Sequence, residues 1–197
     1  RLCDEHRVLL IVDEVQSGLG RTGAWFACQH DNIRPDGVVL GKALGGGILP
    51  IAACIARPEL DVGKEWAFGH YTHEKNPVTA RAALTTIEII EDEGLVANAE
   101  RIGALALERM QAMKRRLGAI GDVRGRGLLL GIELVKDRAT KRPDDELAER
   151  VLYRALDRGL SFKSSMGSVL TLTPPLTVTA DEMIGALDII EEAIAAG

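Results

Sequence analysis

Aromatic side chains are scarce in this chain of 197 residues, in which Phe, Trp and Tyr together make up 4%. We therefore expect a hydrophobic core built from Val, Ile, Leu and Ala. No uninterrupted apolar run reaches the roughly 18 residues that a membrane-spanning helix needs, so we expect no transmembrane segment. The 3 cysteines are odd in number and form no CxxC pattern, which excludes a disulfide-stapled scaffold and favours a reducing, cytoplasmic location.

A strong excess of one charge is also absent. The chain has 24 Lys and Arg residues against 29 Asp and Glu residues, which gives a formal net charge of -5. Such a weakly acidic chain is not expected to bind nucleic acid or an anionic membrane. Hydrophobic residues make up 46% and charged residues 27%, a composition typical of globular proteins, and the length allows one large domain or two small ones.

The first half of the chain has the pattern of an α/β domain. Val8–Val12 is a continuous apolar run, which is typical of a buried parallel strand, and Gly37–Leu40 and Ile51–Ala56 are two further short apolar runs. Asn76 and Pro77 predict the start of a helix, because proline suits the first helical position. The first strand needs neighbours that the few preceding residues do not supply, so we interpret the sequence as the later part of a longer protein.

We expect a domain boundary at Gly94, so that residues 1–93 finish an α/β domain and residues 94–197 form a smaller α+β domain with an antiparallel sheet. Thr179 and Glu182 have the spacing of a capping box, which predicts the start of the last helix. The other elements predicted here are a helix over Leu95–Leu117, strands at Ile120–Arg124 and Leu128–Val135, a surface loop over Asp137–Asp145, a helix over Glu146–Arg158 and a strand at Val169–Leu172.

Two charged residues follow predicted strands directly. Asp13 comes after Val8–Val12, and a carboxylate at the carboxyl end of a parallel strand faces the crevice where α/β proteins bind ligands. Lys42 comes after Val38–Gly41 and precedes a run of glycines at positions 45–47. We expect desolvation at the end of a buried strand to lower the pKa of Lys42 and make its amine a nucleophile. The alternatives are a carboxylate that caps a turn and a lysine whose charged end reaches solvent.

Asp13 and Lys42 taken together suit pyridoxal phosphate. This cofactor needs a lysine amine for its Schiff base and a carboxylate that keeps the pyridine nitrogen protonated, so that the ring can act as an electron sink. His70 and His73, with Glu74 beside them, have a spacing that could hold a metal ion, but no further cluster of ligands accompanies them. We therefore expect no metal.

Five ordered stretches carry a family resemblance, namely Asp13–Gly23, Gly41–Gly47, Asn76–Pro77, Gly121–Leu128 and Thr173–Thr177. Together they resemble the signature of the class III pyridoxal-phosphate aminotransferases, which include the acetylornithine, 4-aminobutyrate and other omega-aminotransferases. The resemblance covers essentially the whole chain. It implies fold type I, with the end of a large parallel-sheet, cofactor-binding domain followed by a small C-terminal α+β domain.

The resemblance also implies roles for single residues. Lys42 would form the Schiff base and shuttle a proton, and Asp13 would pair with the pyridine nitrogen. Gln16 would lie near the phenolic oxygen of the cofactor, and Val15 would pack on a face of its ring. Thr72 would reach the cofactor phosphate of the partner subunit, which implies a homodimer with shared active sites.

The sequence departs from the family pattern at Thr171. Many members have an arginine there that binds the α-carboxylate of the substrate through two charged hydrogen bonds, which a hydroxyl group cannot replace. The stretch Gly69–Pro77 is also bulkier and more charged than usual. Members are longer, and the turn that binds the phosphate and the aromatic residue that stacks on the ring belong to an N-terminal half that this chain lacks.

The resemblance implies transfer of an amino group from an amine or amino acid to a 2-oxo acid. Two alternatives stay open. One is a racemase or epimerase of amino acids or amino amides on the same fold, since some of these enzymes also lack the arginine at the position of Thr171. The other is an inactive structural fragment without the N-terminal half.

Overall fold

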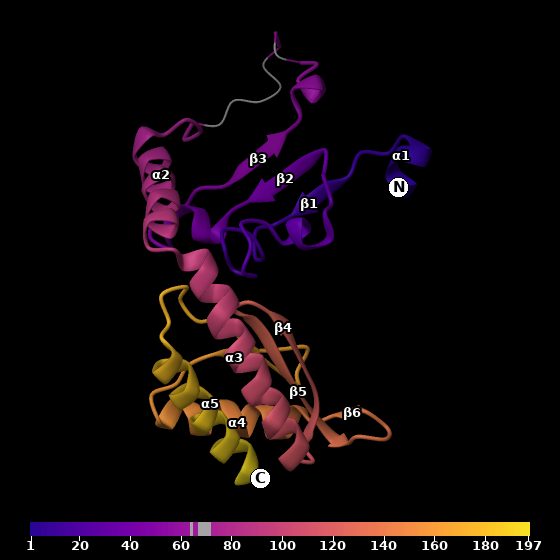
Figure 1. Ribbon diagram of the computed structural model, residues 1–197, viewed down its shortest axis with the longest axis vertical. Coiled ribbons are helices and arrows are strands. Elements are labelled where there is room, and N and C mark those ends of the chain that lie inside the picture. The colour runs from indigo at the N-terminus through magenta and orange to yellow at the C-terminus, as the bar shows by residue number, and fades with distance from the viewer. Residues whose placement is uncertain (64, 67–71) are drawn as a thin grey trace. The chain divides into compact units, whose positions relative to one another are not determined.

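The computed structural model describes residues 1–63, 65–66 and 72–197, which divide into two compact units, Arg1–Val96 and Ala97–Gly197 (Figure 1). Each unit has its own sheet and its own helices. Within the described part of the chain, no helix is long and apolar enough to cross a membrane.

The first unit contains a sheet of three strands in the order β1-β2-β3. The strands are β1 (Ile11–Asp13), β2 (Gly37–Leu40) and β3 (Ala53–Ala56). β1 and β2 run parallel and β3 runs antiparallel to β2. The prediction for Gly37–Leu40 is confirmed, whereas the strand predicted over Ile51–Ala56 begins at Ala53.

The prediction of a buried strand over Val8–Val12 is wrong. The strand begins only at Ile11, and the exposed fractions of Val8, Leu9 and Ile11 are 58%, 52% and 60%. The Asp36 carboxylate accepts the amide proton of Leu10 at 2.7 Å, so a side chain takes the place of a strand partner just before β1. Among the described strands β1 has only β2 beside it, and its apolar side chains therefore remain exposed.

Two of the short helices connect these strands, one precedes them and one follows them, before one long helix. They are α1 (Leu2–His6), the 3-10 helices η1 (Ala27–Asp31), η2 (Lys42–Gly45) and η3 (Pro58–Leu60), and α2 (Pro77–Asp92). The predicted start of α2 is confirmed, because the Asn76 side chain accepts the Val78 amide proton at 2.9 Å and Pro77 occupies the first turn.

The second unit is an antiparallel sheet with helices on one face. Its helices are α3 (Leu95–Arg116), which begins just before the boundary, α4 (Asp145–Asp157) and α5 (Ala180–Ala195). Four strands lie in the order β4-β5-β8-β7 and β6 pairs with β5; they are β4 (Ile120–Arg126), β5 (Leu129–Asp137), β6 (Arg142–Pro143), β7 (Lys163–Ser165) and β8 (Val169–Leu172). This arrangement confirms the predicted α+β unit.

The core of the second unit is aliphatic, as the composition predicts. Side chains from the three helices and from β4, β5 and β8 form one buried cluster, and none of its fully buried members is aromatic. Thr179 and Glu182 form the predicted capping box, in which the Thr179 amide donates to Glu182 Oε2 at 2.9 Å. The surface loop predicted over Asp137–Asp145 is wrong at four residues, because Asp137 ends β5, Arg142 and Pro143 form β6, and Asp145 begins α4. The short strands β6 and β7 are polar and give no hydrophobic signal in the sequence.

Candidate active site

The structure places Asp13 and Lys42 at the same edge of the first sheet. Asp13 is the last residue of β1 and pairs in register with Val39 of β2. Gly41 follows β2, and Lys42 opens the short helix η2. Because β1 and β2 are parallel neighbours, both chemical groups lie at their carboxyl ends, where α/β proteins build ligand sites.

The Asp13 carboxylate is held by its own turn. Its Oδ1 atom accepts the amide proton of Val15 at 2.9 Å, so the side chain has a set direction at the end of β1. The residue is exposed, and its second carboxylate oxygen has no partner among the residues that the structure describes. One oxygen is therefore used to orient the group while the other remains available for a ligand.

Lys42 has an unusual backbone conformation. Its φ is 45°, in the left-handed region where a side chain other than glycine costs on the order of 1–3 kcal/mol, and such strain concentrates at functional sites. Leu44 and Gly45 behind it are buried, which anchors the turn. The side chain of Lys42 is exposed in this chain, so the expected desolvation at the strand end is not present here.

The structure brings Val15 close to this pair. A Cβ atom built on Gly41 would lie 3.5 Å from Val15 Cγ1, so the Val15 side chain packs beside the residue that precedes Lys42. Gln16 is exposed in the turn after β1. Thr72 is exposed, and residues 67–71 before it, which include His70, lie outside the described residues.

Glu14 is a feature of this edge that sequence reasoning missed. Although Asp13 and Gln16 on either side of it are exposed, Glu14 is only 2% exposed. Its carboxylate accepts hydrogen bonds from the Ser17 hydroxyl at 2.5 Å and from the Cys28 amide at 2.8 Å. The spacing of Glu14 and Ser17 was the only signal in the sequence, since Cys28 reaches Glu14 from a separate helix.

The residues at this edge fit pyridoxal phosphate. Lys42 offers an exposed amine for the aldehyde, Asp13 offers an exposed carboxylate for the ring nitrogen, and Val15 offers an apolar surface for the ring. No group of three or more His, Cys, Asp or Glu residues that could hold a metal lies in the described part of the chain. The donor set therefore suits an organic cofactor with an aldehyde and a basic ring nitrogen.

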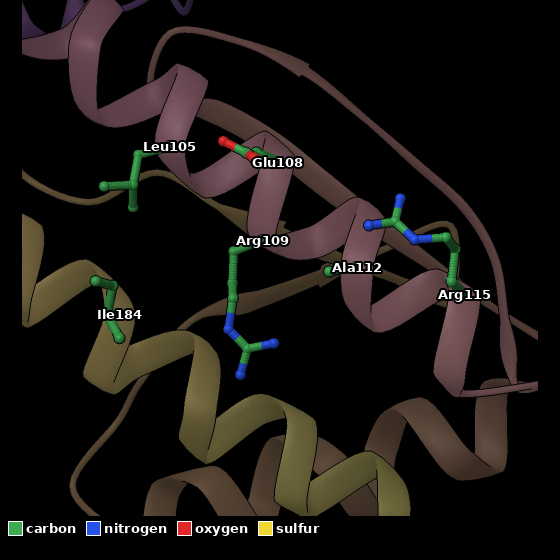
Figure 2. Close-up of a pocket in the computed structure, with 6 residues that line it drawn as sticks. All are labelled: Leu105, Glu108, Arg109, Ala112, Arg115 and Ile184. Atoms are coloured by element: carbon green, nitrogen blue, oxygen red, sulfur yellow. The ribbon is translucent and has the colours of Figure 1, made fainter.

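The cavity drawn in Figure 2 lies elsewhere, between α3 and α5 of the second unit, and has a volume of about 280 Å³. Figure 2 shows the Arg109 guanidinium pointing toward α5, where it forms ion pairs with Asp188 at 2.7 Å and Glu191 at 2.6 Å. These contacts join the two helices and leave the charge of Arg109 compensated. None of the predicted site residues lines this cavity.

Thr171 lies on β8 of the second unit. Its neighbours across the sheet are Gly131 on β5 and Lys163 on β7. The Thr171 Oγ1 atom lies 2.8 Å from the Ser165 hydroxyl oxygen, so the two hydroxyl groups are hydrogen-bonded to each other. The position therefore carries a neutral hydroxyl pair.

Comparison with known proteins adds to this geometry. A family model described as Aminotransferase class-III matches residues 1–194. Leucine/methionine racemase from Thermococcus litoralis is 47% identical over 196 residues, which cover 99% of this chain and 44% of the racemase. (R)-1-hydroxy-2-aminoethylphosphonate ammonia-lyase from Vibrio splendidus is 45% identical over 194 residues, which cover 98% of this chain and 40% of the lyase.

A solved structure agrees with the family match. An amine transaminase from an uncultivated Pseudomonas species, crystallised in its PLP-bound form, matches with a TM-score of 0.93 and 32% sequence identity. The match covers 99% of this chain and 46% of the transaminase. The chain thus spans less than half the length of the relatives that it matches.

Proposed function

The chain belongs to the class III aminotransferase family of pyridoxal-phosphate-dependent, fold type I enzymes, and on that premise we propose that the protein is an aminotransferase. It moves an amino group from an amine or amino acid to a 2-oxo acid. Residues 1–93 belong to the cofactor-binding domain and residues 94–197 form the smaller domain.

One observation carries the cofactor assignment on which this proposal rests. The Asp13 carboxylate and the Lys42 amine stand at the carboxyl ends of two parallel strands that are hydrogen-bonded neighbours. A lysine amine and a carboxylate are the two groups that the cofactor requires from its protein. The resemblance in sequence and the shared fold support the same assignment.

Pyridoxal phosphate, when bound, supplies an aldehyde that takes up amines and a ring that stores electrons. With the cofactor bound, the Lys42 amine would hold its aldehyde, and once displaced by the substrate amine it would move a proton at the substrate carbon. The free oxygen of Asp13 would hold the ring nitrogen in its protonated form. Val15 would cover one ring face, and Gln16 would lie near the phenolic oxygen.

Reductive trapping tests the cofactor attachment on which this function depends. The full-length protein is incubated with pyridoxal phosphate, reduced with borohydride and digested, and mass spectrometry locates the modified lysine. We expect the modification on Lys42 and its loss in Lys42→Ala, while the exposed Lys75 remains unmodified and serves as an internal control. Cofactor attached to another lysine instead would show that the assignment is wrong.

A second candidate is racemisation or epimerisation of an amino acid. It is favoured by the 47% identity with the Thermococcus litoralis racemase, and by Thr171, because some racemases of the same family also lack the arginine at this position. Lys42 and Asp13 keep the same roles, but the proton returns to the substrate carbon. Chiral chromatography of an L-amino acid incubated without any 2-oxo acid separates the two functions, because only racemisation yields the D-enantiomer under that condition.

A further inference from the structure

Glu14 forms hydrogen bonds with three parts of the first unit, namely β2, its own turn and η1. Its backbone amide donates to the Val39 carbonyl oxygen on β2 at 2.9 Å, and its own carbonyl oxygen accepts the Gly18 amide proton at 2.9 Å. Its carboxylate binds the Ser17 hydroxyl in the same turn and the Cys28 amide on η1. A buried charge with both oxygens hydrogen-bonded is well satisfied, and it holds the groups that bind it firmly in place.

The backbone of the turn from Glu14 to Gly18 is tightly packed. A Cβ atom on Gly18 would lie 2.9 Å from the Glu14 carbonyl oxygen and 3.2 Å from its Cβ, so glycine is needed for the backbone to close this tightly. The neighbouring Val15 amide, one residue along, is the donor that orients the Asp13 carboxylate. Any shift of Glu14 is therefore passed on to both Asp13 and Val15.

The environment keeps Glu14 ionised. Burial by itself raises the pKa of the Glu14 carboxyl, but the hydrogen bonds from Ser17 and Cys28 outweigh it and hold the pKa below its ordinary value. Burial and the nearby Glu14 charge raise the pKa of the Cys28 thiol, which therefore stays protonated at neutral pH. The anchor is thus an ionised carboxylate that accepts two charge-assisted hydrogen bonds, which a neutral amide can replace only by weaker neutral ones.

We propose that Glu14 is a positioning residue that acts through Asp13 and Val15 on the pyridoxal ring. The inference rests on the proposed function of Asp13 and Lys42. A site of this kind has to be held within about 0.5 Å of its productive geometry, and Glu14 is the buried group that fixes the backbone between Asp13 and Val15. Glu14 itself touches neither substrate nor cofactor.

The test uses Glu14→Gln in the full-length protein, because glutamine keeps the shape but exchanges one acceptor oxygen for a donor. We expect the dissociation constant for pyridoxal phosphate to rise about 10- to 100-fold, the range seen when a residue that orients a metal ligand is lost. We also expect a shift in the pH at which the absorbance of the bound cofactor changes. Thermal unfolding of the apoprotein is measured in parallel.

Thr22→Val is the matched control. Thr22 is 5% exposed in the same loop region and its hydroxyl lies 3.1 Å from His30 Nε2, so the change removes a buried hydrogen bond without touching Asp13 or Glu14. We expect it to lower the melting temperature and leave the cofactor affinity and the absorbance titration unchanged. If Glu14→Gln behaves in the same way, Glu14 is merely structural and the proposal is overturned.

Ser17→Ala covers the case in which Glu14→Gln does not fold. It removes only the hydroxyl donor to Glu14. We expect the cofactor affinity and the absorbance titration to shift in the same direction as in Glu14→Gln, but by a smaller amount. The absence of any shift would overturn the proposal. A wild-type protein whose Lys42 takes up no cofactor would instead refute the proposed function itself, and with it the role of Glu14.

Discussion

The amide of Glu14 and the carbonyl oxygen of Val39 form a hydrogen bond of 2.9 Å. Since Asp13 pairs in register with Val39, this bond extends the pairing of β1 and β2 one residue beyond the last residue of the strand. The backbone is therefore fixed on both sides of Asp13. The carboxylate of Asp13 and the turn that carries Lys42 belong to one continuous hydrogen-bonded edge.

Replacing Asp13 by alanine tests its place opposite the ring nitrogen. We expect Asp13→Ala to keep Lys42 able to bond the cofactor but to lower kcat by about a thousandfold or more, because the electron sink is lost. Steady-state kinetics and the absorbance of the bound cofactor measure the two effects. Asp31→Ala is the control, since Asp31 is an exposed carboxylate on η1, and near-normal turnover in Asp13→Ala would contradict the assignment.

The neutral hydroxyl pair of Thr171 and Ser165 predicts that the enzyme does not select for substrates with an α-carboxylate. In Thr171→Arg a positive charge replaces the neutral group, and we expect preference to shift toward substrates with an α-carboxylate by about 1.5–3 kcal/mol, the range for hydrogen bonds to charged groups. The measurement is the ratio of kcat/KM for an α-amino acid to that for its decarboxylated amine. Thr171→Val removes the bond to Ser165 without adding charge, and it should leave that ratio unchanged. A wild-type enzyme that already prefers the α-amino acid strongly would show that another residue holds the carboxylate.

The role expected for Thr72 predicts that the enzyme works as a homodimer. If its hydroxyl reaches the phosphate in the partner subunit, Thr72→Ala weakens pyridoxal-phosphate binding by about 5- to 10-fold, which corresponds to the loss of one hydrogen bond. Fluorescence titration measures the affinity and sedimentation measures the oligomeric state. The exposed Thr177 provides the control variant Thr177→Ala. An active monomer would remove the basis for a shared site.

The close approach of Gly103 on α3 to Gly127 predicts a loss of stability. A Cβ atom on Gly103 would lie 2.1 Å from the Gly127 carbonyl oxygen, so the backbone has to move to admit one. We expect Gly103→Ala to lower the free energy of unfolding by about 1–3 kcal/mol, the range for overpacking. Gly185→Ala on α5 meets nothing within 4 Å and should raise stability by about 0.8–1 kcal/mol through helix propensity alone. Denaturant titration compares the two, and equal effects would contradict the packing argument.

Glu14 also predicts a dependence of stability on pH. Because its pKa in the folded protein lies below the ordinary value of 4.5, the unfolded chain takes up its proton first as the pH falls. The contribution of Glu14 to stability is therefore complete above pH 4.5 and is lost as the pH falls through the folded pKa. Urea unfolding at a series of pH values should show a steeper acid loss in the wild type than in Glu14→Gln. If the free energy of unfolding falls equally with pH in the two proteins, the Glu14 carboxylate does not contribute to stability in this way.

The sequence by itself determined features that depend on neighbouring residues. Asn76 and Pro77 begin α2, and Thr179 with Glu182 begins α5, because helix caps are made within one turn of chain. The motifs around Asp13 and Lys42 were also readable, since Asp13 ends β1 and Lys42 follows β2 after a single glycine. Strand β2 was predicted correctly because its apolar residues are contiguous.

Only the tertiary structure decided which of these groups are buried and what they touch. Val8, Leu9 and Lys42 look like buried residues in the sequence, but burial depends on what packs against them, and each is exposed in this chain. Glu14 looks like a solvent-exposed loop residue and is buried, because Cys28 reaches it from a helix 14 positions away. Contacts between distant segments leave no periodic signal in either segment, and these contacts fix the edge of the sheet that carries Asp13 and Lys42.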